Sequence, residues 1–261
     1  MLVKSPKYRK PLHSNQIRLL NIIFKFRFVS VPLLAKYLSK DKSTIYEQLL
    51  TLSSQGYIRK NYDSSYQLPP RPASYALATK GIKFLRDNTD LSQTALRNMS
   101  KNGAASAALV ERSLTTMSLC HQLTQQYPYK FDIYTKSEMS AVDELIRPLP
   151  DLMLRRRRNH PTKPEEYLLE LLEPSVMSWL LRKRIRAHQE LAEASEFQYP
   201  NVLLVATNDS TERRIMHILE NCYDDFEFYA TTIDRLATDD TAIWRQAFED
   251  DEVDRPVFKN L

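Results

Sequence analysis

The residues best suited to chemistry in the first third of the chain are polar and cationic side chains between positions 42 and 48. The outward positions of a segment with helical periodicity are occupied by Lys42, Ser43, Thr44, Tyr46, Glu47 and Gln48. Hydroxyl and amide groups can hydrogen-bond base edges in a major groove, and lysine can neutralise a phosphate. We therefore expect Ser43, Thr44 and Gln48 to contact bases. We expect Lys42 and Tyr46 to contact phosphate.

A second group of cations flanks a predicted hairpin. Residues 57–62 alternate like a strand, residues 73–77 read as the returning strand, and the turn between them is polar and rich in proline. Three cations, Arg59, Lys60 and Arg71, belong to this hairpin. We expect them to hold the flanking DNA backbone or the minor groove.

Three short helices are predicted before the hairpin, at 16–26, 31–38 and 42–54. Asp41 can cap the third helix, and Gly56 follows its end, where a left-handed residue is favoured. This order, followed by the hairpin and a helix from Thr79, predicts a winged helix-turn-helix. The stretches QGYI and RPASYALATKG resemble those of bacterial winged-helix DNA-binding domains.

Charge is unevenly distributed along the chain. The net charge is +5, yet residues 1–90 contain 16 Lys and Arg against 5 Asp and Glu, which leaves the rest of the chain at −6. Such an excess in a small domain indicates a polyanionic partner. Because an anionic membrane would not account for the helix-turn-helix order, we expect double-stranded DNA and no membrane. The alternative is a winged-helix surface that contacts proteins.

Several classes of protein are excluded by composition. Three scattered glycines cannot build a phosphate-binding loop, and two cysteines and five histidines show no zinc-ligand spacing. No serine or cysteine nucleophile motif is found. The basic N-terminus lacks the apolar core of a signal peptide, and no apolar run approaches the length of a bilayer. We expect a cytoplasmic, nucleoid-associated protein.

The second part of the chain alternates between helices and strands. After a polar segment at 91–103, predicted to be a linker, helices are predicted at 104–126, 176–197 and 211–221. Strands are predicted at 131–134, 150–154, 167–172, 201–206 and 226–231. This order predicts an α/β sandwich around a mixed sheet. The predicted domains are therefore 1–90 and 104–235, followed by an acidic segment at 236–261 that would shield a basic surface or dock a partner.

Pro150-Asp151 on one predicted strand and Glu170 on the next resemble the core of the PD-(D/E)XK nucleases, which have a restriction-endonuclease-like fold. The resemblance implies that Asp151 and Glu170 hold Mg²⁺ and that a lysine two residues after the glutamate activates water. Position 172 is leucine, so Lys183 on the following helix is the candidate catalytic lysine. We favour the alternative that the scaffold has lost its chemistry and holds no cofactor. Glu111 is a further candidate carboxylate.

The two predicted domains together resemble the replication-relaxation family of bacterial plasmids and integrative elements. The stretches that carry the resemblance are RPASYALATKG, PLPDLMLRRRR, YLLELLEPS, WLLRKRIRAHQEL and NVLLVATND. The resemblance implies a DNA-binding accessory factor in replication, relaxation or transfer of a mobile element, with replication or relaxase proteins as partners. A homodimer is compatible with such a module.

Two other functions stay open, a magnesium-dependent endonuclease and a winged-helix transcriptional regulator. The basic clusters Arg155–Arg158 and Arg182–Arg186 are either solvated surface or an extension of the DNA track.

Overall fold

Two units divide the chain, Met1–Ser106 and Ala107–Leu261, and each has its own sheet. The computed structural model describes residues 12–61, 72–142, 145–157, 165–195, 199–220, 228–238 and 243–246. Four groups of sequence-derived candidates lie outside these ranges: Arg71, Arg158, the acidic pair at 239–240 and the acidic run at 249–254.

Three helices open the N-terminal unit: α1 (Ser14–Phe26), α2 (Val31–Leu38) and α3 (Lys42–Ser54). The turn between α2 and α3 is tight, because Ser39 adopts a left-handed conformation and the N–H of Lys40 donates to the carbonyl of Ala35 at 2.9 Å. As expected, Gly56 follows the end of helix α3, and its φ is +78°. The N–H of Tyr57 then donates to the carbonyl of Leu52, which closes the helix end.

The sheet of this unit has three antiparallel strands in the order β1 (Val29–Ser30), β3 (Ser74–Leu77), β2 (Ile58–Asn61). Strand β3 lies in the middle and is buried, whereas β2 presents Arg59 and Lys60 to solvent. The strands predicted at 57–62 and 73–77 are thus present. Strand β1 was not predicted, since two residues leave no periodic signal.

Residues 91–103 do not form a polar linker. After α4 (Thr79–Asn88), the chain forms α5 (Gln93–Met99) and the 3₁₀ helix η2 (Ser100–Ala104), both within the N-terminal unit. Leu96 and Met99 are buried there, and Nε of Arg27 donates to Oδ1 of Asn102 at 2.7 Å. Burial of these side chains fixes the segment despite its polar composition.

The sheet of the C-terminal unit is mixed. Its order is β4 (Phe131–Thr135), β5 (Leu152–Arg156), β6 (Glu166–Leu172), β7 (Asn201–Ala206), β8 (Phe228–Thr232) and β9 (Arg245–Gln246). Strands β6, β7 and β8 are parallel, and the remaining pairs are antiparallel. The predicted alternation of helices and strands around a mixed sheet is confirmed.

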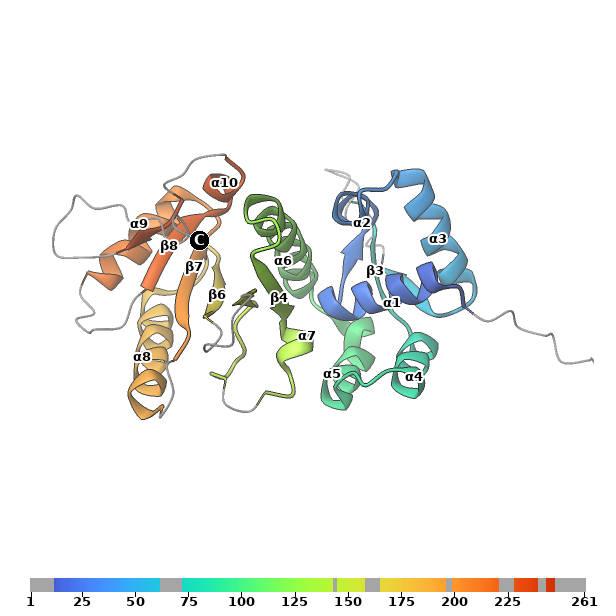
Figure 1. Cartoon of the computed structure of the whole chain (residues 1–261), viewed down its shortest axis with the longest axis horizontal. Helices are drawn as coiled ribbons and strands as arrows, with labels where there is room; N and C mark the ends of the chain where they lie inside the picture. Colours follow the sequence, from blue (N-terminus) through green and yellow to red (C-terminus); the bar gives the residue numbers. More distant parts are fainter. Residues whose placement is uncertain are drawn as a thin grey trace, which may run out of the picture. The chain divides into compact units, whose positions relative to one another are not determined.

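Helices cover both faces of this sheet. Its helices are α6 (Ala107–Gln126), α7 (Lys136–Met139), α8 (Ser178–Ala194), α9 (Asp209–Leu219) and α10 (Ile233–Leu236). Leu168 and Val202 point to one face and pack against Leu181 and Ile215 from α8 and α9. Figure 1 shows these two helices on one side of β7 and β8 and the green α6 on the other side of the sheet.

Part of the predicted acidic C-terminal segment belongs to this core. Strand β9 pairs with β8, and the side chains of Ile243 and Trp244 are buried. Nε1 of Trp244 donates to the hydroxyl of Tyr127 at 3.1 Å.

In the described part of the chain, no helix has both the length and the hydropathy that crossing a bilayer requires.

Candidate nucleic-acid interface and buried carboxylates

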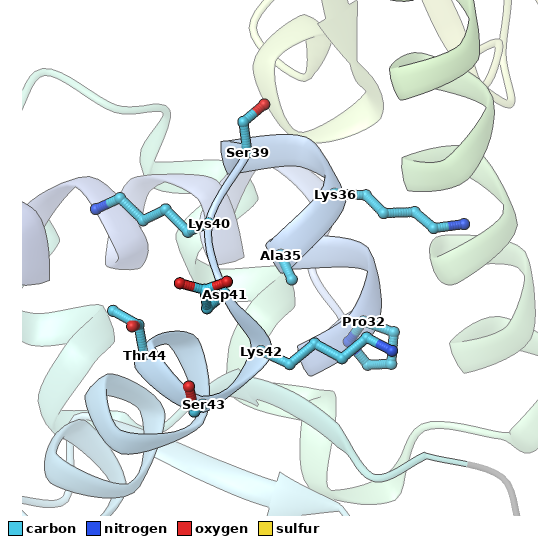
Figure 2. Close-up of a pocket in the computed structure, with 9 residues that line it drawn as sticks. All are labelled: Pro32, Ala35, Lys36, Ser39, Lys40, Asp41, Lys42, Ser43 and Thr44. Atoms are coloured by element: carbon cyan, nitrogen blue, oxygen red, sulfur yellow. The ribbon is translucent and has the colours of Figure 1, made fainter.

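A hollow of about 970 Å³ lies at the turn between α2 and α3, and lysines stand around it. Its lining includes Lys36, Lys40, Asp41 and Lys42 (Figure 2). In Figure 2 the side chains of Lys36 and Lys42 extend in the same direction and that of Lys40 in the opposite one. None of the three lysines forms an ion pair with any residue that the structure describes. The turn is therefore a cationic, solvent-facing surface.

The outward face of α3 continues from this hollow. Ile45, Leu49 and Leu52 are buried, so the opposite side of the helix faces solvent. Lys42, Ser43 and Thr44 are exposed at its start, as the periodicity predicts. This end of the helix combines one cation with two hydroxyl groups, which can accept and donate hydrogen bonds.

One aromatic and one apolar side chain also lie on the outward face of α3. Tyr46 is 46% exposed and Leu50 is 54% exposed, whereas Gln48 is partly buried. Leu50 was not among the candidates, although its spacing of four residues from Tyr46 placed it on the outward side. An apolar side chain on this face can contact a thymine methyl group.

On strand β2, the two predicted cations differ in their surroundings. Arg59 and Lys60 are both exposed, with Lys60 opposite Tyr75 on β3. The guanidinium of Arg59 lies against η2, so close that a β-carbon on Gly103 would stand 2.3 Å from Nη1 of Arg59. Arg59 therefore packs on its own unit in this conformation. Arg71, the third predicted cation of the hairpin, lies outside the described residues.

Lys80, another cation of the N-terminal unit, stabilises the fold of that unit. Its Nζ donates to the carbonyl of Gln55 at 2.6 Å and lies 3.8 Å from the ring centroid of Tyr57. A cation at the C-terminal end of α3 also interacts favourably with the helix dipole. Lys80 thus holds the end of the helix, in contrast to the lysines at its beginning.

In the C-terminal unit, Asp151 is buried and fully engaged. Its Oδ1 accepts from Nε of Arg112 at 2.9 Å and lies 2.8 Å from Nζ of Lys136, while Oδ2 accepts from Nη2 of Arg112 at 2.6 Å. Burial alone would raise the pKa of Asp151, but Lys136 and Arg112 lower it below its usual value. Asp151 is therefore held as a carboxylate.

The ion pair between Arg112 and Asp151 also replaces part of the sheet ladder. Strand β5 begins at Leu152, opposite Leu169 on β6. Beyond it, the N–H of Leu171 donates to Oδ2 of Asp151 at 2.8 Å, and Nη2 of Arg112 donates to the carbonyl of Leu171 at 2.8 Å. Because buried backbone groups require partners, the pair has a structural task.

Glu170 is the second buried carboxylate, and it faces α8. Its Oε1 accepts from Nε of Arg184 at 2.8 Å and from Nη2 of the same side chain, and lies 3.2 Å from Nε2 of His188. Nδ1 of His188 lies 3.0 Å from the hydroxyl of Tyr199. Burial lowers the pKa of His188, more than Glu170 raises it, and burial raises the pKa of Tyr199 to about 12.

The other two candidates for nuclease chemistry do not join these carboxylates. Lys183 is exposed on α8, while its neighbour Arg184 turns inward to Glu170. Glu111 is exposed on α6, and its neighbour Arg112 is the residue that contacts Asp151. Successive residues of a helix point about 100° apart, so a shift of one position changes the side that a residue faces.

Mg²⁺ does not fit this donor set. The oxygens that would coordinate it accept hydrogen bonds from arginine, and a hard cation requires several such oxygens. Among the described residues, no group of three or more Asp, Glu, His or Cys side chains could hold a metal ion. The buried carboxylates therefore form ion-pair networks that use the chain's own cations.

The basic run at the end of β5 is neutralised in the same way. Arg155 pairs with Glu166, Arg156 with Glu165, and Arg157 with Asp132. Arg158 lies outside the described residues. Comparison with known proteins gives no matching family model and no matching curated protein.

Proposed function

We propose that the N-terminal unit is a winged helix that binds double-stranded DNA, with α3 entering the major groove. The observation that carries the proposal is the exposed, cationic α2–α3 turn, where none of the three lysines has an ion-pair partner among the described residues. An exposed helix of this width fits the major groove of B-DNA. The helix order and the adjoining three-stranded sheet support the same assignment.

In this arrangement the residues of α3 divide into two roles. Ser43, Thr44 and Gln48 contact base edges, and Lys42 and Tyr46 contact phosphate. Lys60 and Arg59 on β2 hold the flanking backbone, for which Arg59 must leave Gly103. Arginine has a long side chain, so this change needs only rotamer adjustments.

The C-terminal unit is proposed to be a nuclease-like α/β scaffold without nuclease chemistry. The observation in favour is that Arg112 and Arg184 occupy the carboxylates that would hold a metal. The chain then acts as a non-enzymatic, site-specific accessory protein. Its setting, replication, relaxation or transfer of a plasmid or mobile element, rests on the family resemblance.

The test of DNA binding is a fluorescence-anisotropy titration of the full chain with duplex DNA at several salt concentrations. The triple variant Lys42→Glu, Arg59→Glu, Lys60→Glu should bind more weakly and lower the slope of log K against log salt by about three units. The matched control reverses three exposed cations of α4 and α5, namely Lys83, Arg86 and Arg97. Equal losses in the two triples would contradict the assigned surface.

Two further measurements separate the proposal from its alternatives. Footprinting on origin, transfer-region and random duplexes tests site specificity, and protection confined to the chain's own promoter would indicate a transcriptional regulator. Nicking of supercoiled plasmid in Mg²⁺ or Mn²⁺, abolished by Glu170→Ala, would overturn the non-enzymatic assignment.

A further inference from the structure

The outward face of α8 combines an exposed tryptophan with cations. Leu181, Ile185 and His188 are buried on the opposite side of the helix. Trp179 is 60% exposed, and Lys183 and Arg186 follow it at spacings of four and seven residues. Residues so spaced lie on one side of a helix, about one turn of 5.4 Å apart. Arg182 lies beside them and is also exposed.

The cations on this face of α8 are not paired with carboxylates of the described residues. Arg182, Lys183 and Arg186 make no ion pair with any part of the chain that the structure describes. By contrast, Arg184 on the same helix pairs with Glu170, and Arg155, Arg156 and Arg157 each meet a carboxylate. These three cations are therefore available to an anionic partner.

The indole of Trp179 is held at the beginning of α8 by a contact with Met177. Its Nε1 donates to Sδ of Met177 at 3.2 Å, although most of the side chain is accessible to solvent. A large aromatic side chain in water gains free energy when a partner covers it. A flat aromatic surface beside cations is the combination that stacks bases and neutralises phosphates.

We propose that this face of α8 binds single-stranded nucleic acid, with a base stacked on Trp179 and phosphates held by Arg182, Lys183 and Arg186. An unpaired strand is the partner, because bases inside a duplex are stacked on each other and cannot cover an indole. A lipid surface suits the face less well. Leu181 and Ile185 of α8 are buried, whereas Leu180 is 47% exposed, and Glu190 and Glu193 are exposed further along the helix and would be repelled by an anionic bilayer.

The site lies in the C-terminal unit and does not depend on duplex binding by α3. Its test can therefore fail while the proposed function stands, and the reverse also holds. The two tryptophans of the chain make the test direct, because Trp179 is exposed and Trp244 is fully buried. Quenching that affects only the exposed indole reports on Trp179.

The experiment titrates the full chain with oligo(dT) of about 20 nucleotides, which exceeds the site size of a typical single-strand-binding module. Tryptophan emission and the anisotropy of a labelled oligonucleotide are followed in parallel. We expect the exposed component of the emission to be quenched while the Trp244 component is unchanged. Removing a stacked base contact by Trp179→Ala should weaken binding between about fivefold and 150-fold.

Three comparisons keep the outcome decisive. Trp179→Phe, which retains a stacking ring, should bind more tightly than Trp179→Ala. The triple variant Arg182→Ala, Lys183→Ala, Arg186→Ala should weaken binding and reduce its salt dependence. Each of its single variants should show part of this effect, while the single-site control Arg213→Ala on α9 should show none. The titrations are repeated in the Lys42→Glu, Arg59→Glu, Lys60→Glu background, in which binding through the N-terminal unit is weakened.

The proposal is overturned if oligo(dT) leaves the emission of the wild-type chain unchanged. It is also overturned if quenching persists in the α8 triple variant at wild-type affinity, because the strand then binds elsewhere. A blue shift with vesicles of phosphatidylserine and phosphatidylcholine, without any response to oligo(dT), would assign the face to a lipid surface instead.

Discussion

The lysines around the α2–α3 turn and the arginines of the C-terminal unit carry the same charge in opposite surroundings. Lys36, Lys40 and Lys42 face solvent, and no described carboxylate pairs with them. Arg112 and Arg184 instead pair with buried carboxylates and are themselves partly buried. A run of cations in a sequence therefore does not by itself mark a binding surface. The carboxylates around it decide whether the charge is available.

Helix α8 contains both kinds of cation within two residues. Lys183 points to solvent, whereas Arg184 donates to Glu170 beneath the helix. The basic sequence of this helix looks uniform, but its two sides have different tasks. Substitutions should therefore separate paired from unpaired cations clearly, in stability on one side and in binding on the other.

The largest expected effect is on the pair between Arg112 and Asp151. Arg112→Met leaves a buried carboxylate without its bidentate partner, which should lower the free energy of unfolding by about 3–5 kcal/mol. Urea unfolding followed by tryptophan emission measures the free energy of unfolding of the C-terminal unit, since both tryptophans belong to that unit. The control Arg182→Met removes an exposed cation and should change the free energy by less than about 0.5 kcal/mol. Equal losses would remove the distinction between the two kinds of cation.

A smaller loss is expected at Gly81, where the N-terminal unit depends on close packing rather than on charge. A β-carbon at this position would stand 2.1 Å from the backbone oxygen of Tyr57. Gly81→Ala should therefore cost about 1–3 kcal/mol, since the backbone at Tyr57 must move. Circular dichroism should show a lower unfolding midpoint for this unit, whereas the midpoint from tryptophan emission should not change. A stability equal to that of the wild type would show that α4 can shift away from Tyr57.

Much of the fold follows from patterns that lie close together in the sequence. Helices α2 and α3 have the bounds that their apolar spacing predicts, and Gly56 follows α3 as expected. Asp41 stands before α3 but makes no side-chain capping hydrogen bond. Segment α5 was missed because its composition is polar. The spacing of Ala95, Leu96 and Met99, all buried, was the signal that could have revealed it.

The surroundings of the carboxylates could not be predicted in the same way. Asp151 and Glu170 were identified from their positions on strands, but Arg112, the bidentate partner of Asp151, lies 39 residues earlier in the chain. Periodicity shows which side of a helix is apolar and does not show which residue of another element lies opposite it. Lys183 was the predicted cation beside these carboxylates, whereas Arg184 is the residue that contacts Glu170. The two differ by one position, and only the packing of α8 on the sheet determines which of them faces inward.

Stability at acid pH should distinguish the two units further. Because burial lowers the pKa of His188 in the folded state, the unfolded chain binds the proton more readily. The contribution of His188 is therefore complete above the unfolded pKa of about 6.5 and is lost as the pH falls toward the lowered folded value. Unfolding followed by tryptophan emission should show a falling midpoint below about pH 6.5. His188→Gln should flatten this profile, while His217→Gln on the exposed side of α9 should leave it unchanged.

The smallest expected effects concern single lysines of the N-terminal unit, and they compare paired with unpaired cations within one unit. Lys36→Ala removes an exposed cation beside the α2–α3 turn. It should lower the salt slope of duplex binding by about one unit and change stability by less than about 0.5 kcal/mol. Lys80→Ala removes the hydrogen bond to Gln55 and the contact with the Tyr57 ring, so it should cost about 1 kcal/mol of stability. Its salt slope should stay close to that of the wild type, because Lys80 is already bound within the unit. If Lys80→Ala lowered the slope and Lys36→Ala did not, phosphate would contact the C-terminal end of α3, and the proposed orientation of this helix on DNA would be reversed.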